Sequence, residues 1–472
     1  MFIGRRAELA LLAKRLERVA ASGAGTAVAL RGRRQVGKSR LVQEFCDRAA
    51  VPYVFSTATK GASPIEAVAA FLRDLKESPL PGDPELVPQI ANGNWPDAFR
   101  ILATALPDAP SIVVLDELPW LAEQDPVFDG ALQTGWDRLL SSKPVLLLLL
   151  GSDLHMMERL TAYDRPFYGR ADNLVLGPLN PADTGEALGL DAADAIDAHL
   201  VSGGLPGIIR TWPHATPALD FMRAECADPA AALFSVPEAS LLAEFPNPDI
   251  SRRVLEAIGS GDRTHANIAA TAGNRDAALP SGTLSPLLRR LTGEKNVLAM
   301  DEPLSTRPGK PALYRIADSN LRLYLAVLRA AHQQARRGRP EAGYRLVERR
   351  WTTWRGRAVE PLIRQSLERP ELPWPDVETV GGWWNRQFNP EIDLVGADRA
   401  PVANRICFVG SIKWLNGPFD AHDLVDLRRA AAQLPGLDPA TTGMAAVSLS
   451  GAETKGLDLL WTPQDVVAAW RP

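Results

Sequence analysis

The sequence predicts an α/β protein built on a parallel sheet, followed by mainly helical segments and a second, smaller α/β domain. Uninterrupted apolar runs such as Ala27–Leu30 and Pro144–Leu150 are typical of strands that are buried on both faces. Helical patterns, such as Pro64–Leu75 and Trp95–Leu106, lie between these runs. This alternation of strands and helices is the pattern of a parallel sheet with helices on its faces.

A phosphate-binding loop follows the first strand. Residues 32–39 have the pattern G-x-x-x-x-G-K-S, and Leu41, Val42 and Phe45 then recur at helical spacing. In such a loop, backbone N–H groups and the following helix N-terminus surround phosphate oxygens. We expect Lys38 to reach the β- and γ-phosphates of ATP and Ser39 to bind Mg²⁺. The other residues expected to line the nucleotide are Gly32, Arg33, Arg34, Gln35, Val36, Gly37 and Arg40.

A second motif ends the apolar run at residues 111–115. Asp116 and Glu117 follow directly, which is the Walker B pattern. An aspartate at this place holds the magnesium shell, and the adjacent glutamate orients and activates the attacking water. Two carboxylates at the end of a buried strand would be costly without a cation. We therefore assign Asp116 to the metal and Glu117 to catalysis.

Two further positions near the predicted sheet edge have alternative interpretations. Ser152 follows the apolar run Pro144–Leu150, where a polar side chain would sense the γ-phosphate; it would equally serve as the N-cap of a helix at Leu154–Leu160. Arg170 follows that helix and is either an arginine finger for a neighbouring subunit's nucleotide or a surface charge. Both are candidate catalytic residues.

Composition limits the class of protein. A chain of 472 residues predicts two to four domains, and 46% hydrophobic with 23% charged residues is ordinary for a globular protein. A net charge of −4 gives no global support for nucleic-acid or membrane binding. Three scattered cysteines predict neither a disulfide framework nor a zinc site, and no apolar run is long enough for a bilayer. These features favour a reducing, cytoplasmic location without a membrane partner.

The middle of the chain is mainly helical. Helical spacing at Asp183–Leu200 and Ala218–Cys226 predicts two helices, and Ser202–Pro206 forms a helix-breaking turn between them. Three more helices and a two-stranded hairpin give the winged-helix pattern: 250–258, 267–272, 279–291, then strands at 297–298 and 314–316. Its basic residues, Arg289, Arg290, Arg307 and Lys310, suit either DNA contact or a regulatory role. An arginine-rich stretch at 336–350 is either a nucleic-acid surface or a solvated linker.

The C-terminal part contains an acidic constellation. Glu360 lies on a predicted helix at Trp351–Leu367, Asp393 lies in a strand, and Lys413 ends the next strand. Two acids that hold a divalent metal and a lysine beside the attacking water are the parts of a metal-dependent nuclease. Ser411 stands where a second strand carboxylate would be expected, and serine is a poor ligand for Mg²⁺. The alternative is a set of structural ion pairs.

Together these motifs resemble the AAA+/STAND superfamily, and within it the archaeal-type ATPases with a C-terminal PD-(D/E)xK restriction-endonuclease-like domain. The residues that carry the resemblance are Phe2-Ile3-Gly4-Arg5, Gly32–Ser39, Leu115-Asp116-Glu117, Gly151-Ser152, Tyr168-Gly169-Arg170 and Gly203-Gly204-Leu205-Pro206. The resemblance implies a parallel sheet of order 5-1-4-3-2, with Gly4, Arg5, Gly204 and Pro206 lying against the adenine. It also implies an ATPase core at 1–180, a helical lid at 181–245, a winged helix at 246–335 and a degenerate nuclease-like domain at 340–472.

Three functions are consistent with this resemblance. The first is a Mg-ATP-dependent ATPase that acts as a regulatory switch on a protein partner, on itself or on nucleic acid. The second is an ATP-gated nuclease, against which Ser411 argues. The third is a nucleotide-dependent DNA-binding regulator that uses the winged helix.

Overall fold

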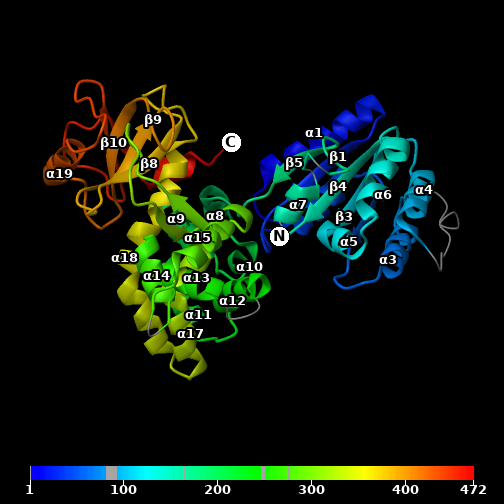
Figure 1. The fold of residues 1–472 in the computed structure, drawn as a ribbon, viewed down its shortest axis with the longest axis horizontal. Helices are drawn as coiled ribbons and strands as arrows, with labels where there is room; N and C mark the ends of the chain where they lie inside the picture. Colours follow the sequence, from blue (N-terminus) through cyan, green and yellow to red (C-terminus); the bar gives the residue numbers. More distant parts are fainter. Residues whose placement is uncertain are drawn as a thin grey trace. The chain divides into compact units, whose positions relative to one another are not determined.

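The computed structural model describes residues 2–80, 93–152, 154–160, 162–163, 165–245, 250–274 and 277–471 (Figure 1). The chain divides into two compact units, Met1–Pro178 and Leu179–Pro472. Each unit has its own sheet and its own hydrophobic core.

The first unit is built on a five-stranded parallel sheet of order β2-β3-β4-β1-β5. This is the predicted order 5-1-4-3-2, so that prediction is confirmed. The strands are β1 (Thr26–Arg31), β2 (Tyr53–Thr57), β3 (Ser111–Asp116), β4 (Val145–Gly151) and β5 (Ala171–Val175). The helical elements are α1 (Arg6–Ser22), α2 (Lys38–Ala49), α3 (Pro64–Glu77), α4 (Trp95–Ala105), α5 (Leu118–Gln124), α6 (Phe128–Gly135), the π-helical turn η2 (Trp136–Leu140) and α7 (Leu154–Leu160).

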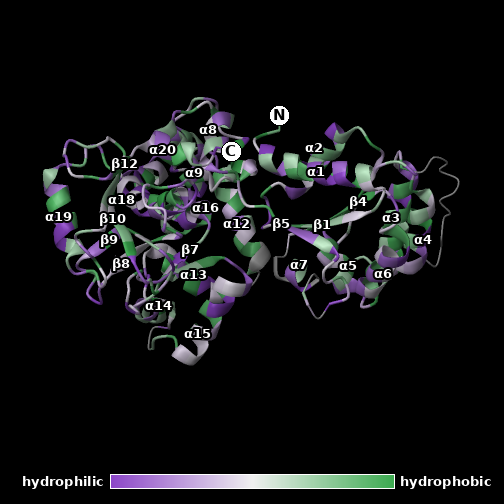
Figure 2. Ribbon diagram, turned by 90° about the horizontal axis from the view of Figure 1, so that it is seen from above, coloured by the Kyte–Doolittle hydropathy of each residue, from purple (hydrophilic) through white to green (hydrophobic). Residues whose placement is uncertain are grey.

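Burial explains why these segments form strands. Every residue of β3 and β4 is buried, as expected for central strands of a sheet covered on both faces. Purple and green alternate along the covering helices, which is the pattern of amphipathic helices (Figure 2). On one face, Trp95 packs against Phe99 and Phe128 with ring centroids 5.6 and 5.0 Å away. This packing fixes the sheet whose carboxyl edge carries the motifs.

The second unit has a five-stranded mixed sheet of order β12-β11-β10-β9-β8 and a separate antiparallel pair, β6 and β7. Its strands are β6 (Leu298–Asp301), β7 (Leu313–Ile316), β8 (Thr379–Trp384), β9 (Glu391–Ala397), β10 (Ile406–Lys413), β11 (Gly443–Ser448) and β12 (Leu459–Trp461). Its helical elements are α8 (Pro181–Leu188), α9 (Ala192–Ser202), α10 (Pro206–Ile209), α11 (Ala218–Glu225), α12 (Ala232–Glu244), α13 (Ile250–Ser260), α14 (His265–Ala272), α15 (Ser281–Arg289), η3 (Arg290–Glu294), α16 (Ser319–Leu323), η4 (Tyr324–Leu328), α17 (Arg329–Arg336), α18 (Pro340–Leu367), α19 (Ala421–Ala431) and α20 (Pro463–Ala468).

The predicted helix at 183–200 is wrong as a single element. Gly189 adopts φ 65° and ends α8, and the Asp191 side chain accepts the Asp194 N–H to cap α9. A left-handed glycine followed by an N-cap aspartate is the usual signature of a break between two helices.

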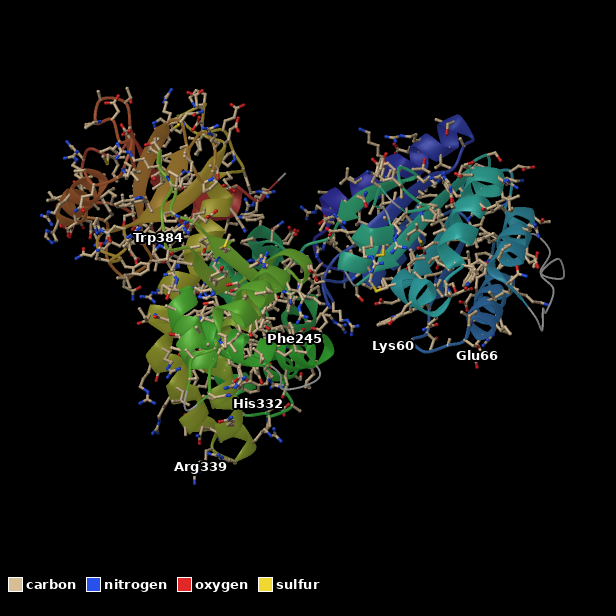
Figure 3. The ribbon with its side chains drawn as sticks, viewed as in Figure 1. Lys60, Glu66, Phe245, His332, Arg339 and Trp384 are labelled. Carbon is tan, nitrogen blue, oxygen red and sulfur yellow. The ribbon has the colours of Figure 1, made fainter. Side chains whose placement is uncertain are left out.

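Hydrogen bonds connect the segments of the second unit. The Trp384 indole, labelled in Figure 3, donates to the Pro311 carbonyl at 2.8 Å, which ties the β6–β7 loop to β8. The Ser319 hydroxyl donates to Leu200 O at 2.7 Å and so ties α16 to α9. Within the described residues, no helix is both long and apolar enough to cross a membrane.

Candidate functional site

The loop between β1 and α2 has the backbone that a phosphate-binding loop requires. Gln35 and Gly37 adopt left-handed conformations with φ of 67° and 91°. A Cβ added at Gly32 would lie 2.4 Å from the Leu176 carbonyl oxygen, so only glycine fits there. The first helical residue, Lys38, lies where the helix N-terminus faces the loop.

Lys38 is turned into its own loop. Its side chain is buried, and Nζ donates to Gly32 O at 2.8 Å and to Arg33 O at 3.1 Å. Burial lowers the pKa of this ammonium, whereas the nearby carboxylates of Glu117 and Asp116 act in the opposite direction. The Lys38 ammonium group is therefore held within the loop, where the phosphate oxygens of a nucleotide would contact it.

Ser39 and Asp116 form the candidate metal site. The Ser39 hydroxyl donates to Asp116 Oδ2 at 2.7 Å, and Asp116 Oδ1 accepts the Glu117 N–H at 2.9 Å. Asp116 is only 4% exposed, and burial raises the pKa of its carboxyl. A hydroxyl and a buried carboxylate are hard oxygen donors that a divalent cation would stabilise. These two residues fit Mg²⁺.

Glu117 and Ser152 meet at the same sheet edge. β3 and β4 are neighbours in parallel register, with Leu115 opposite Leu149. Glu117 adopts φ 54°, an uncommon conformation for glutamate, and its Oε2 accepts a hydrogen bond of 2.8 Å from the Ser152 hydroxyl. Ser152, the predicted γ-phosphate sensor, thus contacts Glu117, the predicted catalytic glutamate, directly. The two residues belong to separate sequence motifs, so the sequence did not reveal this contact.

The N-terminal segment is fixed to the phosphate-binding loop by Arg5. This side chain is 5% exposed and donates to Val36 O at 3.0 Å and Gly177 O at 2.6 Å. Gly4 and Arg5 both have positive φ, which turns the chain into α1. Arg5 thereby holds the loop, while its contact with adenine stays a prediction.

Three other residues predicted to line the nucleotide are exposed in this structure. Arg34 and Gln35 are exposed, and Arg40 pairs with Glu44 at 2.9 Å along α2. Their contact with ATP also stays a prediction. For Arg40, the local i,i+4 ion pair accounts for the side-chain position without a ligand.

Arg170 has a partner within its own unit. Its Nε and Nη2 donate to the two carboxylate oxygens of Asp137, each at 2.7 Å, and its Nη1 donates to Pro166 O and Tyr168 O. This bidentate pair raises the pKa of the Arg170 guanidinium through its hydrogen bond with Asp137. In this structure Arg170 ties the loop before β5 to η2, and a role as an arginine finger stays a prediction.

Gly204 and Pro206 lie in the second unit. Gly204 has φ 66°, and a Cβ there would lie 2.1 Å from the Leu179 carbonyl oxygen. Pro206 begins α10. The turn between α9 and α10 therefore accounts for both residues, and their contact with adenine stays a prediction.

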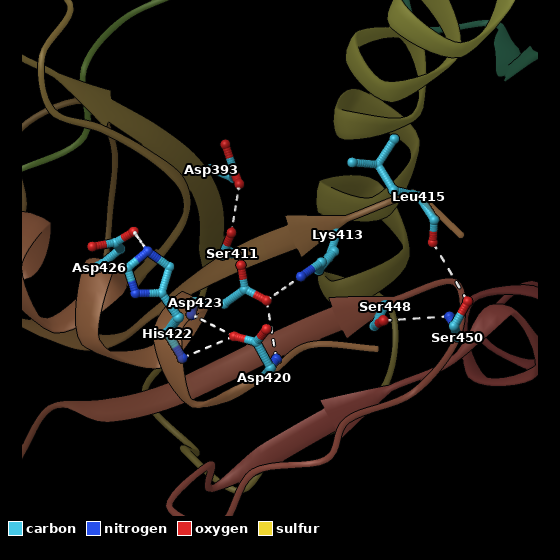
Figure 4. Close-up of polar contacts among 10 residues, drawn as sticks. All are labelled: Asp393, Ser411, Lys413, Leu415, Asp420, His422, Asp423, Asp426, Ser448 and Ser450. Atoms are coloured by element: carbon cyan, nitrogen blue, oxygen red, sulfur yellow. Dashed lines mark hydrogen bonds and ion pairs between the residues drawn. The ribbon is translucent and has the colours of Figure 1, made fainter. Parts of the chain in front are cut away.

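In the second unit, two residues of the predicted nuclease constellation, Asp393 and Lys413, have protein partners that Figure 4 shows. Asp393 Oδ2 accepts hydrogen bonds from the Ser411 hydroxyl at 3.0 Å and the Ile412 N–H at 2.8 Å. Lys413 forms an ion pair with Asp423. Among the residues that the structure describes, no group of three or more His, Cys, Asp or Glu side chains could hold a metal ion. Asp393 and Lys413 are engaged by neighbouring groups in this structure, and a metal site at these residues stays a prediction.

Arginines surround the remaining acid, Glu360. Arg364 Nη2 lies 3.5 Å from Glu360, and its Nε donates to Asp393 O at 2.9 Å. Arg263 and Arg322 also interact electrostatically with Glu360, whose pKa is raised by burial. Guanidinium groups supply the positive charge beside this acid. Arg364 could have been found from its i,i+4 spacing to Glu360, whereas Asp423, Arg263 and Arg322 are brought in by the tertiary fold.

Comparison with known proteins supports part of this assignment. A family model described as "AAA ATPase domain" matches residues 1–148. The segment is therefore similar to AAA ATPase domains. The match covers the loop at 32–39 and the Asp116–Glu117 pair, and it supports ATP as the nucleotide.

Similarity across the longer chain is weak. An uncharacterized protein of Methanocaldococcus jannaschii is 22% identical over 403 residues, which cover 84% of each chain. The solved Walker-type ATPase of Pyrococcus abyssi is 18% identical and covers 69% of this chain and 96% of that one, with a TM-score of 0.49. The ORC2 protein of Aeropyrum pernix, solved in ADPNP–ADP complexes, is 13% identical and covers 71% and 95%, with a TM-score of 0.46. These values are too low to transfer a function to the second unit.

Proposed function

We propose that the protein is a Mg-ATP-binding and ATP-hydrolysing switch of the AAA+/STAND type, similar to the archaeal-type ATPases. The observation that carries the proposal is a set of three hydrogen bonds at one sheet edge. Lys38 donates to its own loop, Ser39 donates to Asp116, and Ser152 donates to Glu117. Ser39 and Asp116 would hold Mg²⁺, which would neutralise phosphate charge. Lys38 would bind the β- and γ-phosphates, and Glu117 would orient and deprotonate water.

The second unit would couple nucleotide state to a target. We divide it into a helical lid at 181–245, a winged helix at 246–335 and a nuclease-like domain at 340–472, with the ATPase core at 1–180. The antiparallel pair β6–β7 after α13, α14 and α15 supports the winged-helix interpretation. A nucleotide-dependent DNA-binding regulator that uses this segment is the second candidate.

A metal-dependent nuclease is disfavoured by the same structure. Asp393 is engaged by Ser411 and Ile412, and Lys413 by Asp423. Lys413 would have to leave Asp423 before it could position a water molecule, and Ser411 supplies no carboxylate for a metal. We therefore propose a structural or binding role for the C-terminal domain.

The test is steady-state ATP turnover of the wild-type protein and of Glu117→Gln, with and without duplex DNA. Glutamine keeps an oxygen that can accept the Ser152 hydrogen bond but cannot take a proton, so turnover should fall by about 100-fold or more. ATP affinity should stay within about threefold, since Glu117 is not assigned to ground-state binding. Glu123→Gln, at an exposed position on α5, is the matched control.

The outcomes separate the candidates. Turnover that vanishes in Glu117→Gln and is indifferent to DNA supports a switch with a protein partner. Turnover that rises with DNA supports the DNA-coupled form. Tight ATP binding without turnover in the wild type would contradict the enzyme and leave a nucleotide-bound scaffold.

A further inference from the structure

A hairpin of two helices in the second unit concentrates positive charge. α17 ends at Arg336, Gly338 turns the chain with φ 71°, and α18 begins at Pro340. Between residues 336 and 357 the sequence contains eight arginines and only two acidic residues, Glu341 and Glu348. The whole chain has a net charge of −4, so this local excess is not a property of the average surface.

Six of these arginines are exposed at the turn and on the first part of α18, and one of them, Arg350, donates to Ala326 O at 2.8 Å. We name the other five the arginine hairpin: Arg336, Arg337, Arg339, Arg345 and Arg349. Figure 3 shows Arg339 at the end of the hairpin. Over the described parts of the chain, none of the five lies within ion-pair distance of a carboxylate. By contrast, Arg329 and Arg355 on the same two helices pair with Glu256 and Asp197.

Two acidic side chains lie beside this arginine surface without neutralising it. At about 100° per residue, Arg345 lies about 40° from Arg349 and from Glu341, and about 60° from Glu348, around α18. Glu341 pairs with Arg223 of α11 at 3.5 Å rather than with the arginines of α18. Residues 336–349 contain five arginines and two acids, so the surface keeps a local excess of positive charge.

We propose that the arginine hairpin binds the phosphate backbone of nucleic acid. Exposed guanidinium groups without carboxylate partners are suited to phosphate oxygens, and the N-terminus of the 28-residue helix α18 adds partial positive charge at the same end. A lipid surface is a poorer match, because none of the large hydrophobic side chains found exposed in the described residues lies between 329 and 357. Contacts to the phosphate backbone do not depend on base identity, so we expect binding through them to be independent of sequence.

The inference does not rest on ATP hydrolysis, and its test uses the full chain without nucleotide. Fluorescence anisotropy measures binding of a labelled duplex of about 30 base pairs across a series of salt concentrations. The test variant is the triple substitution Arg339→Gln, Arg345→Gln and Arg349→Gln. The matched control changes three exposed arginines that do have partners, Arg100→Gln, Arg405→Gln and Arg429→Gln, which removes the same net charge.

We expect the wild type and the control to bind duplex DNA with similar affinity and a similar salt slope. The test variant should bind about tenfold or more weakly, and its slope of log affinity against log salt should be shallower by about 2 to 3, close to one per lost phosphate contact. Because the substitutions are on exposed side chains, ATP affinity and the circular dichroism spectrum should be unchanged.

Three results would overturn the proposal. The first is equal loss of affinity in the test variant and the control, which would indicate net charge alone. The second is loss of binding only when Arg289, Arg307 and Lys310 are changed to glutamine, which would place DNA on the winged helix. The third is no DNA affinity at low salt together with arginine-dependent binding to anionic vesicles or to an acidic protein. Failure of any kind leaves the ATPase proposal untouched, because turnover is measured separately.

Discussion

A buried ion pair in the second unit makes stability depend on pH. Asp197 on α9 accepts a hydrogen bond of 2.9 Å from Arg355 on α18, and the two side chains are 12% and 13% exposed. Burial raises the pKa of Asp197 to about 6, even though the charge of Arg355 acts in the opposite direction. The Trp414 side chain also favours the ionised carboxylate, but its effect is smaller than that of burial. Desolvation thus outweighs the attraction of the pair.

The direction of the effect follows from this shift. An aspartate in the unfolded chain has a pKa near 3.8, so the folded protein holds this proton more tightly. The stability that Asp197 contributes through this tighter proton binding is fully present below its unfolded pKa and is lost as pH rises through about 6. The full effect is about 3 kcal/mol, and about 2 kcal/mol of it falls between roughly pH 7.5 and pH 4.5.

The perturbation that isolates this effect is Asp197→Asn. Urea unfolding of the wild type and the variant is followed by tryptophan fluorescence at about pH 7.5 and pH 4.5. Other groups that titrate in this range, including the buried His199 whose pKa is lowered to about 4, are present in both proteins and cancel in the difference. The unfolding free energy of the wild type minus that of the variant should rise by about 2 kcal/mol on acidification.

Asp108→Asn, at a fully exposed side chain, is the control and should show a constant difference. If the Asp197→Asn difference stays constant or falls on acidification, the reasoning from burial is wrong. That result would mean that Arg355 holds Asp197 ionised throughout.

Two further predictions concern the ATPase unit. Gly32→Ala places a Cβ 2.4 Å from a backbone oxygen. It should weaken ATP binding at least about tenfold and lower the unfolding free energy by about 1–3 kcal/mol, measured by calorimetry. Gly130→Ala is the control, because a Cβ there meets open space within a helix and should be neutral or stabilising. An equal effect of both substitutions would refute the steric argument. Ser152→Ala removes the hydroxyl that donates to Glu117, so kcat should fall about tenfold while KM changes little. Ser152→Thr keeps a hydroxyl and should restore much of the rate. A change in KM alone would show that Ser152 acts in substrate binding.

The sequence predicted the first sheet and the residues at its edge because both depend on short-range patterns. β3 and β4 are buried along their whole length, so their apolar runs are uninterrupted and easy to recognise. The carboxyl ends of parallel neighbours lie at one edge, which brings Asp116 and Glu117 to the loop and to Ser152. The motifs therefore specify much of the site as well as its elements.

Tertiary contacts determined what the sequence did not reveal. Asp137 and Arg170 are far apart in sequence and meet only through the packing of η2 against the loop before β5. The C-terminal constellation was predicted by residue type, but Asp423, which pairs with Lys413, and Arg263 and Arg322, which lie near Glu360, are brought there by the fold. Whether acids and a lysine form a metal site depends on the neighbouring charges, and the folded chain determines which charges are neighbours.

The bonds at the nucleotide edge imply that binding and turnover are separable. Lys38 gives two hydrogen bonds to the carbonyls of Gly32 and Arg33, and these must be exchanged for bonds to phosphate when ATP is bound. The Ser152–Glu117 bond uses one carboxylate oxygen, so the other oxygen can act on water while this bond persists. Because Glu117 is already held in position by Ser152, little reorganisation is needed to reach the transition state. At Lys38, the exchange of carbonyl for phosphate hydrogen bonds contributes instead to ATP affinity in the ground state. Substitutions at Lys38 should therefore act mainly on affinity, and substitutions at Glu117 mainly on rate. This separation is what distinguishes a hydrolysing switch from a protein that only holds nucleotide.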